Sequence, residues 1–232
     1  MTAEDYQSGQ ILLIDKPLHW TSFQVVNKLR WELKQRFKLK NIKVGHAGTL
    51  DPLATGLLII CTGKMTKQID TFQTQIKEYT GTLILGSTTP SYDLETDINE
   101  TFPTEHITHK LIEETTKQFT GDIQQYPPVF SAIKKDGKRL YEFARAGEDV
   151  EINSRLVTIE TFEIIKKDAL NVDFRVVCSK GTYIRSLAHD FGKALQSGAH
   201  LSALRRTKIG DFNVANAITV DQFVKSLNNY II

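Results

Sequence analysis

Residues Gly45–Cys61 have the sequence GHAGTLDPLATGLLIIC, which is the most unusual stretch of the chain. Its glycines and alanines allow backbone or ligand to approach closely. Pro52 disfavours helical dihedral angles at Asp51, so this acid is predicted to lie on a stiff, extended loop. The apolar run Leu57–Cys61 is predicted to enter the core and anchor that loop. A carboxylate held rigidly beside an apolar floor suits a nucleophile or general base, although a lone Asp-Pro pair is more commonly a simple turn.

The overall composition is that of an ordinary globular protein. Of 232 residues, 41% are apolar and 24% are charged, and no linker divides the chain, so a single domain over residues 1–232 is predicted. The 29 basic residues barely exceed the 27 acidic ones, so overall charge does not indicate a nucleic-acid partner. The N-terminus has no secretory signal, and no apolar run is long enough to span a membrane. Cys61 and Cys178 form no CxxC pair and are predicted to be buried free thiols in a reducing cytoplasm.

Hydrophobic periodicity predicts mixed helices and strands without a regular βαβ rhythm, so the predicted fold class is α+β. The predicted strands are Ile11–Ile14, Tyr79–Leu85 and Val172–Cys178. The predicted helices are one that begins at Thr21 or Ser22 and reaches Phe37, followed by Leu111–Phe119, Ile184–Leu195 and Val220–Leu227. Thr219 and Gln222 match a capping box before the last helix.

Two segments carry an excess of basic side chains. The first long helix and its tail set seven basic residues against the single acid Glu32, and these are Lys28, Arg30, Lys34, Arg36, Lys38, Lys40 and Lys43. A solvated helix face is the simpler explanation, while the size of the excess also suits a surface that faces phosphates. Asp122–Glu151 contains PP, KKDGKR and RAGED, and is predicted as a basic, partly irregular excursion from the core.

Two other motifs are weakened by their context. The GK pair at residues 63–64 is typical of a phosphate-binding loop, but positions 58 and 65 hold Leu and Met instead of Gly and Ser or Thr. His189-Asp190 resembles the HD pair of metal-dependent phosphohydrolases, although a polar pair on the outer face of a helix is the commoner explanation. The other histidines show no metal-ligand spacing, so no metal site is predicted.

The string around Asp51 closely resembles the second motif of the TruB family of tRNA pseudouridine synthases, whose nucleophilic aspartate falls on Asp51. The resemblance covers nearly the whole chain, and the other motifs follow in family order. They are Lys16-Pro17 with Trp20-Thr21-Ser22, Lys77-Glu78-Tyr79 with Leu85-Gly86, the thumb segment Gln124–Gly147, the arginine motif Cys178–Gly192, and the closing motif Leu201–Phe212. Departures from the family pattern are His19 in place of glycine, Phe130 in place of tyrosine, and a looser loop at Thr88–Asp97.

The resemblance implies the pseudouridine synthase fold, with a central, mainly antiparallel mixed sheet flanked by helices and a thumb-like insertion at about residues 122–151. It implies isomerisation of uridine to pseudouridine at position 55, in the T-loop of tRNA, after the base is flipped out. No redox step or group transfer is involved, so no cofactor and no metal are expected. The expected partner is the T-arm of tRNA, and the protein is expected to be a cytoplasmic monomer without a membrane contact. The chain resembles a short form that ends near Ile232 without the family's C-terminal PUA domain.

The resemblance also assigns roles to individual residues. Asp51 is the expected nucleophile, Arg185 the cation that keeps it ionised despite burial, and Tyr79 a catalytic residue that helps to remove the proton from C5. The expected substrate-binding residues are His46, which fills the space left by the flipped uridine, together with Tyr79, Tyr183 and Leu204. Lys16 and Pro17 are expected to support the catalytic loop. The expected phosphate contacts are Lys134, Lys135, Lys138, Arg139 and Arg145.

Simpler explanations exist for several of these residues, and other functions stay open. Core packing would explain Tyr79, Tyr183 and Leu204, and a surface salt bridge would explain Arg185. One alternative function is an RNA-binding folding helper whose catalysis is dispensable. Another is a pseudouridine synthase for ribosomal RNA or another tRNA position. The third is a metal-dependent phosphohydrolase through His189-Asp190, whose activity would be sensitive to EDTA.

Overall fold

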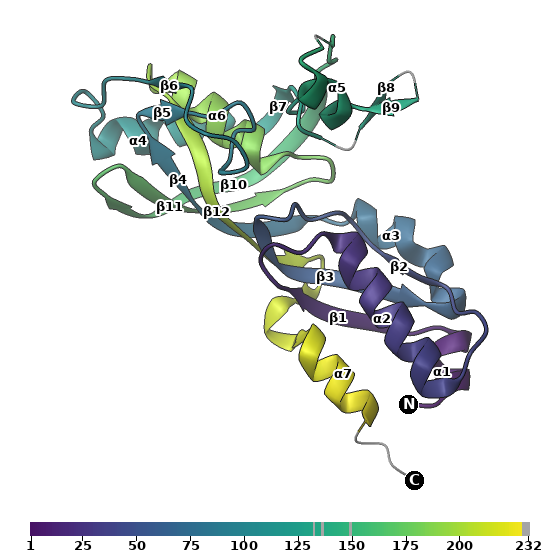
Figure 1. Ribbon diagram of the computed structural model, residues 1–232. Coiled ribbons are helices and arrows are strands. Elements are labelled where there is room, and N and C mark those ends of the chain that lie inside the picture. Colours follow the sequence, from purple (N-terminus) through teal and green to yellow (C-terminus); the bar gives the residue numbers. More distant parts are fainter. Residues whose placement is uncertain (132, 136, 149, 229–232) are drawn as a thin grey trace. The chain divides into compact units, whose positions relative to one another are not determined.

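The apolar run Leu57–Cys61 enters the core, as predicted, and it does so as part of strand β3 (Ala54–Thr62) (Figure 1). Every residue of this strand from position 57 to 61 is completely buried, because both faces of β3 are covered. The strand pairs antiparallel with β1 (Ile11–Lys16) and β2 (Val44–His46), and parallel with part of β12 (Ala199–Ile209). The sheet is therefore mixed and mainly antiparallel, with helices beside it, which confirms the predicted α+β class.

The chain divides into two compact units. Unit 1 comprises Met1–Tyr79 and Leu204–Ile232, and unit 2 comprises Thr80–Ala203. The structure is a computed structural model, and it describes residues 1–131, 133–135, 137–148 and 150–228. In this part of the chain, no helix has the length and apolar character that crossing a membrane requires.

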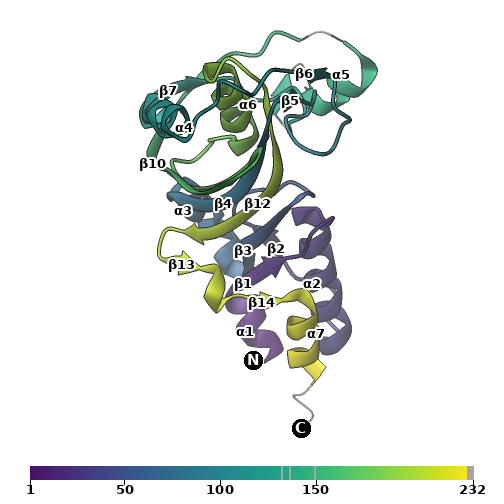
Figure 2. The ribbon, with the colours of Figure 1, turned by 90° about the vertical axis from the view of Figure 1, so that its left-hand side faces the viewer.

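Helices cover one face of the sheet in unit 1. α2 (Ser22–Phe37) and α7 (Val220–Asn228) lie side by side there (Figure 2). Their buried apolar residues pack with alternate residues of the strands, and this cluster includes Leu12, Ile14, Val25, Leu29, Leu33, Leu58, Ile60, Phe223 and Leu227. The intervening residues of β3 point to the opposite face, where they pack with Phe72 of α3 (Ile69–Thr74) and with Ile209. Burial on both faces is the reason that β3 is continuously apolar.

The two longest helices of unit 1, α2 and α7, begin at their predicted N-terminal caps. Thr21 precedes α2 and exchanges hydrogen bonds with Gln24, and Thr219 exchanges the same pair with Gln222 before α7. Shorter elements complete the unit, and they are α1 (Ala3–Ser8), η1 (Gly63–Gln68), β13 (Phe212–Asn213), η3 (Val214–Asn216) and β14 (Ile218–Thr219).

Unit 2 is built on a second group of antiparallel strands. Its larger strands run in the order β4, β11, β10 and β7, and β4 enters this unit from unit 1. The strands are β4 (Lys77–Leu85), β5 (Ser87–Thr88), β6 (Glu100–Thr101), β7 (Gly121–Gln125), β8 (Lys134–Lys135), β9 (Lys138–Arg139), β10 (Arg155–Asp168) and β11 (Asn171–Cys178). The helices are α4 (His109–Thr116), η2 (Lys117–Phe119), α5 (Leu140–Ala146) and α6 (Ile184–Ala194).

Aromatic side chains join the helices of unit 2 to its strands. Phe162 of β10 makes edge-to-face contacts with Phe174 of β11 and Phe191 of α6, at centroid distances of 6.0 and 5.2 Å. Alternate residues of β11 are buried, as its strict alternation predicts. The predicted apolar face of α6 is also buried. This core holds the N-terminal turn of α6, which carries Tyr183 and Arg185, against the sheet.

The segment predicted as an irregular excursion is more ordered at its start. Residues 121–125 form β7, which pairs antiparallel with β10, so the excursion begins after Gln125 and not at Asp122. Beyond it, β8 and β9 pair as a short hairpin that leads into α5. Pairing with the long strand β10 explains the difference, because an edge strand with one exposed face tolerates the polar sequence GDIQQ.

Candidate functional site

Asp51 lies on the short loop between β2 and β3. Two elements hold the loop. The hydroxyl of Ser22, at the start of α2, accepts a hydrogen bond from the Leu50 amide (2.8 Å) and donates one to the Leu50 carbonyl (3.1 Å). The His19 amide donates to the Pro52 carbonyl at 2.8 Å. Both residues that flank Asp51 are therefore tied through their backbones, as the prediction of a stiff loop requires.

Arg206 of β12 holds the same loop through its side chain. Its side chain is 1% exposed. The guanidinium donates to the carbonyls of Leu57 (2.8 Å), Gly48 (3.1 Å) and Thr49 (3.4 Å), which lie before and after Asp51 in the chain. A planar fork of five N–H donors can bind several carbonyls at once, which a lysine ammonium does with much less directional constraint. Arg206 therefore braces the loop at both ends, and it was not among the residues predicted from the sequence.

Lys16 is a second buried cation in this part of unit 1. Its side chain is completely buried, and its ammonium donates to the carbonyls of Pro17 (2.8 Å) and Trp20 (2.6 Å). Burial lowers the pKa of Lys16 to about 8, against the attraction of the Asp51 carboxylate and with the repulsion of Arg206. Lys16 thus stays protonated at neutral pH and contributes a positive charge toward Asp51. Its expected role as support for the loop remains a prediction, to which the structure adds this charge.

His46 lies in β2, opposite Ile60 of β3. Burial and the nearby positive charge of Arg206 lower the pKa of His46, so its imidazole is neutral at pH 7. Its Nδ1 atom is buried without a hydrogen-bond partner in the described part of the chain. A neutral ring beside a loop of small residues could stack on a base, which agrees with the predicted substrate contact without testing it.

Tyr79 and Leu204 also belong to unit 1. Leu204 pairs with Ala54, three residues after Asp51, which places it at the end of the catalytic loop. Tyr79 is almost fully buried in β4, two residues after the buried Lys77. Their predicted contacts with the base remain predictions.

Arg185 is buried in unit 2, so the alternative of a surface salt bridge is wrong. Its guanidinium donates to the carbonyls of Ser91 (3.1 Å) and Phe130 (2.8 Å), and its Nε lies 3.6 Å from a carboxylate oxygen of Asp93. Asp93 is itself held, because its other carboxylate oxygen accepts a hydrogen bond from the Glu95 amide. Arg185 is in this way fixed from three sides.

Tyr183 precedes α6 and is held through its backbone. The side chain of buried Gln125 donates from Nε2 to the Tyr183 carbonyl (3.0 Å), and its Oε1 accepts from the Tyr183 backbone amide (2.7 Å). Arg155 lies over the Tyr183 ring, 5.4 Å from its centroid. The side chain is thus presented by a rigid backbone, which suits the predicted role in base binding.

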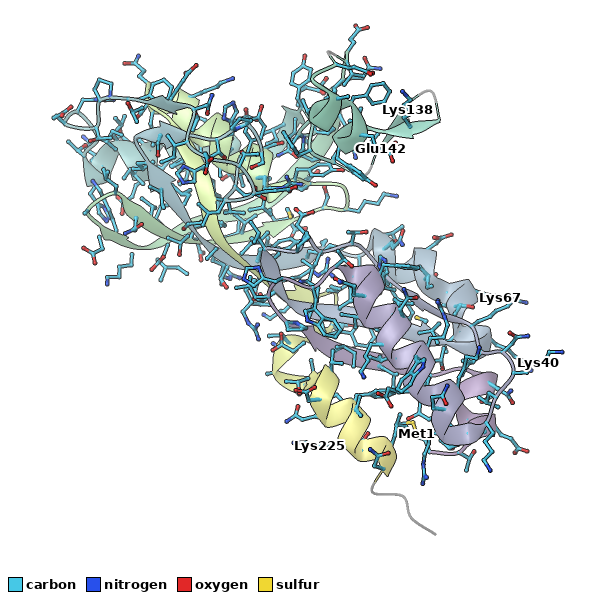
Figure 3. All side chains as sticks on the ribbon, viewed as in Figure 1. Met1, Lys40, Lys67, Lys138, Glu142 and Lys225 are labelled. Carbon is cyan, nitrogen blue, oxygen red and sulfur yellow. The ribbon has the colours of Figure 1, made fainter. Side chains whose placement is uncertain are left out.

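The predicted phosphate contacts lie around β8, β9 and α5. Lys138 is exposed, and its ammonium lies 5.5 Å from the centroid of the Phe143 ring (Figure 3). The side chains of Lys134, Lys135, Arg139 and Arg145 lie outside the described residues, although their backbones belong to these elements.

His189 departs from its predicted place on the outer face of a helix. Its ring is half-buried and stacks on Tyr92. Both cysteines are buried free thiols, as predicted, and burial raises the pKa of Cys61 to about 11. Within the described ranges, no three His, Cys, Asp or Glu side chains gather as metal ligands would.

Comparison with known proteins defines the class to which this fold and aspartate loop belong. Residues 34–184 match the family model described as the N-terminal domain of TruB family pseudouridylate synthases, and residues 185–230 match the tRNA pseudouridylate synthase B C-terminal domain. The protein is therefore a pseudouridine synthase by class. More particularly, because the first match alone covers more than half of the chain, the chain belongs to the TruB family.

Similar proteins agree with this assignment. The chain is 66% identical to the tRNA pseudouridine synthase B of Flavobacterium johnsoniae over 98% of this chain and 100% of that protein. It is 54% identical to the protein of the same name from Phocaeicola vulgatus, over 97% of this chain and 95% of that one. Among solved structures, a Cbf5-Nop10-Gar1 complex matches with a TM-score of 0.72 and 30% identity, over 100% of this chain and 60% of the solved one. The chain thus spans less than two thirds of the length of that solved chain.

Proposed function

We propose that this chain isomerises uridine to pseudouridine at position 55 in the T-loop of tRNA. Its membership of the TruB family and its similarity to proteins named tRNA pseudouridine synthase B support the reaction and the class of substrate. The proposal places the enzyme in the cytoplasm, where its tRNA substrate is found, and treats it as a monomer.

The observation that carries the proposal is the rigid, positively charged setting of Asp51. Ser22 and Arg206 hold its loop through the backbone, while buried Lys16 supplies a positive charge toward the carboxylate. A nucleophilic carboxylate must be ionised and fixed before the substrate arrives, and buried cations favour its ionised form. Burial of a cation is costly unless acceptors or an opposite charge lie close to it, and for Lys16 the Asp51 carboxylate supplies that charge.

In the proposed reaction, the Asp51 carboxylate attacks C1′ of the ribose after uridine has flipped out of the T-loop, and the bond from C1′ to N1 of uracil breaks. The uracil rotates, and its C5 then bonds to C1′ and displaces the carboxylate, which restores Asp51. C5 then loses its proton and N1 gains one, so atoms and charge balance without an added reactant. Tyr79 would stack on the uracil and take part in the proton removal, as the resemblance predicts.

The remaining roles are proposed on the resemblance. His46 would occupy the space left by the flipped base, with Tyr183 and Leu204 beside the uracil. Pro17 would buttress the loop from the end of β1. Arg185 would be the charge partner of Asp51, and since the two residues belong to different units, this pairing rests on the resemblance alone.

The test of the proposed function is tritium release from a tRNA transcript that carries C5-labelled uridine. Release by the wild-type protein, with pseudouridine mapped to position 55, would support reaction and target together. Release with the product at another position would assign a different target to the same chemistry. A folded protein that binds the transcript without release would contradict the proposed reaction and favour an RNA-binding role.

A pH dependence follows from the buried Lys16. As the pH rises above about 8, Lys16 loses its proton and with it the charge that favours ionised Asp51, so kcat is expected to fall. Well below that pH Lys16 is almost fully protonated, and its charge should not limit the rate. Single-turnover rates across this range test the expectation, with Lys16→Met as the control. That variant should be slow throughout and should show no decline near pH 8, and a decline equal to that of wild type would exclude Lys16 as its cause.

Salt dependence tests the proposed grip on phosphates. Lys138→Ala should lower the slope of log affinity against log salt concentration by roughly 0.7 to 0.9, because one fewer phosphate contact is made. Lys225→Ala removes another exposed lysine, from α7 and outside the basic segment, and should leave the slope unchanged (Figure 3). Equal slopes for wild type and Lys138→Ala would remove Lys138 from the RNA contact.

A further inference from the structure

We propose that Tyr92 and His189 are positioning residues, and that their stacked rings hold the turn that aligns the guanidinium of Arg185. This inference rests on the proposed function, because it extends the part that Arg185 takes in it. The family resemblance assigns no role to Tyr92 or to His189, although His189 lies within the arginine motif. Tyr92, Arg185 and His189 all belong to unit 2.

The stack is close and nearly parallel. The ring centroids of Tyr92 and His189 are 3.8 Å apart, and the planes are inclined by 14°. His189 lies one helical turn after Arg185 in α6, so both side chains project from the same side of the helix. Tyr92 stands between Ser91 and Asp93, the two residues of its turn that contact Arg185.

The turn is thereby attached to α6 at two successive points. The first attachment is Arg185, which donates to the Ser91 carbonyl and faces the Asp93 carboxylate. The second is the ring stack one turn further along the helix. Arg185 holds the residues on either side of Tyr92, and the stack adds a second contact with the same helix that resists rotation of the turn. The stack should therefore fix the direction in which Arg185 points.

The backbone of Tyr92 shows that this conformation is imposed by its surroundings. Its φ angle is +64°, in the left-handed region that a bulky residue seldom adopts. Such a conformation persists only where several contacts determine it. The Tyr92 amide donates to the Thr89 carbonyl (3.1 Å), and its carbonyl accepts from the Leu201 amide (2.9 Å). These backbone contacts fix the direction of the Tyr92 side chain, which points toward His189.

The stack is also uncharged at neutral pH. Burial, with a smaller effect from Lys193, lowers the pKa of His189 to about 4, so the imidazole carries no charge. Burial, and then the nearby Asp190, raises the pKa of Tyr92. The Nδ1 atom of His189 is buried without a hydrogen-bond partner in the described part of the chain. His189 therefore acts here as a flat aromatic ring. This packing role accounts for the histidine of the His189-Asp190 pair without a metal.

Substitution of His189 separates positioning from mere packing. His189→Ala should lower kcat about tenfold and leave KM for tRNA within about twofold, because only the direction of Arg185 changes. His189→Phe keeps a flat ring and should restore most of the rate. Tyr92→Ala should resemble His189→Ala, and the double variant should be no slower than either single one. Circular dichroism and thermal unfolding of each variant show that the comparison is made between folded proteins.

An Arg185→Lys background completes the test. There, His189→Ala should have no further effect on kcat, because the group that it positions is already replaced. A tenfold loss that persists in this background, an unchanged kcat in His189→Ala, or a folded His189→Phe variant that stays slow would each overturn the inference. Failure of the proposed function is distinguishable, because the wild-type protein itself would then release no tritium.

Discussion

Replacing Asp51 by asparagine is expected to reduce pseudouridine formation by on the order of 10⁴-fold or more, while tRNA affinity stays within about twofold of wild type. Asparagine has nearly the same shape but carries no negative charge and cannot act as the nucleophile. Because the loop is held through the backbones of Leu50 and Pro52, the substitution should leave its conformation intact. The loss should therefore fall on the chemical step and not on folding or binding.

Single-turnover tritium release and filter binding on the same transcript measure the two quantities. Asp70→Asn is the matched control, since it makes the same change at an exposed acid of α3 in the same unit. It should retain the wild-type rate. An Asp51→Asn variant that turns over normally would sink the proposed mechanism, and one that loses tRNA binding in proportion to rate would make Asp51 a binding residue.

Elements with one regular buried face could be predicted from the sequence. The alternation in β11 and the helical period in α6 both survive in the structure, because each element faces a single core. The start of α2 was predictable as well, since the capping box of Thr21 and Gln24 is a local interaction. Local signals of this kind do not depend on which strands pair.

The longest strand was missed for a physical reason. β10 contains irregularities between Ile159 and Thr161 and between Ile164 and Lys166, where the register of pairing shifts. Each shift moves the following side chains to the other face, so the period of two is lost in the sequence. Pairing with β10 also converts polar residues after Gly121 into a strand, which no property of those residues alone predicts.

The candidate site was predictable in part. Asp51 follows from the local effect of Pro52 and from the family motif. Ser22 and Arg206 could not be found in the same way, because their function depends on contacts with residues far away in the sequence. Arg206 in particular follows another arginine, and such a pair is most simply taken as solvent-exposed charge. A signal existed in the closing motif, but only the structure shows which arginine is buried.

Arg206→Lys should lower kcat by about 100-fold, because a displacement of the catalytic loop by even one ångström has effects of this size. Lysine keeps the charge but has a single ammonium, so it cannot reproduce the fork that reaches Gly48, Thr49 and Leu57. At least one buried carbonyl then loses its partner, and the free energy of unfolding should fall by about 1 to 3 kcal/mol. Tritium release and urea unfolding give the two measurements.

Arg205→Lys is the matched control, being the same substitution one position earlier in β12. Arg205 is only partly buried, and both of its NH groups donate to Asp15, at 3.0 and 2.6 Å. A lysine can keep one of these contacts, so stability should fall by no more than about 1 kcal/mol and kcat should change little. If Arg206→Lys lost stability but kept kcat, Arg206 would be a core residue only. A loss of kcat under conditions where the variant is fully folded would show that the fork sets the position of Asp51, since the positive charge itself is unchanged.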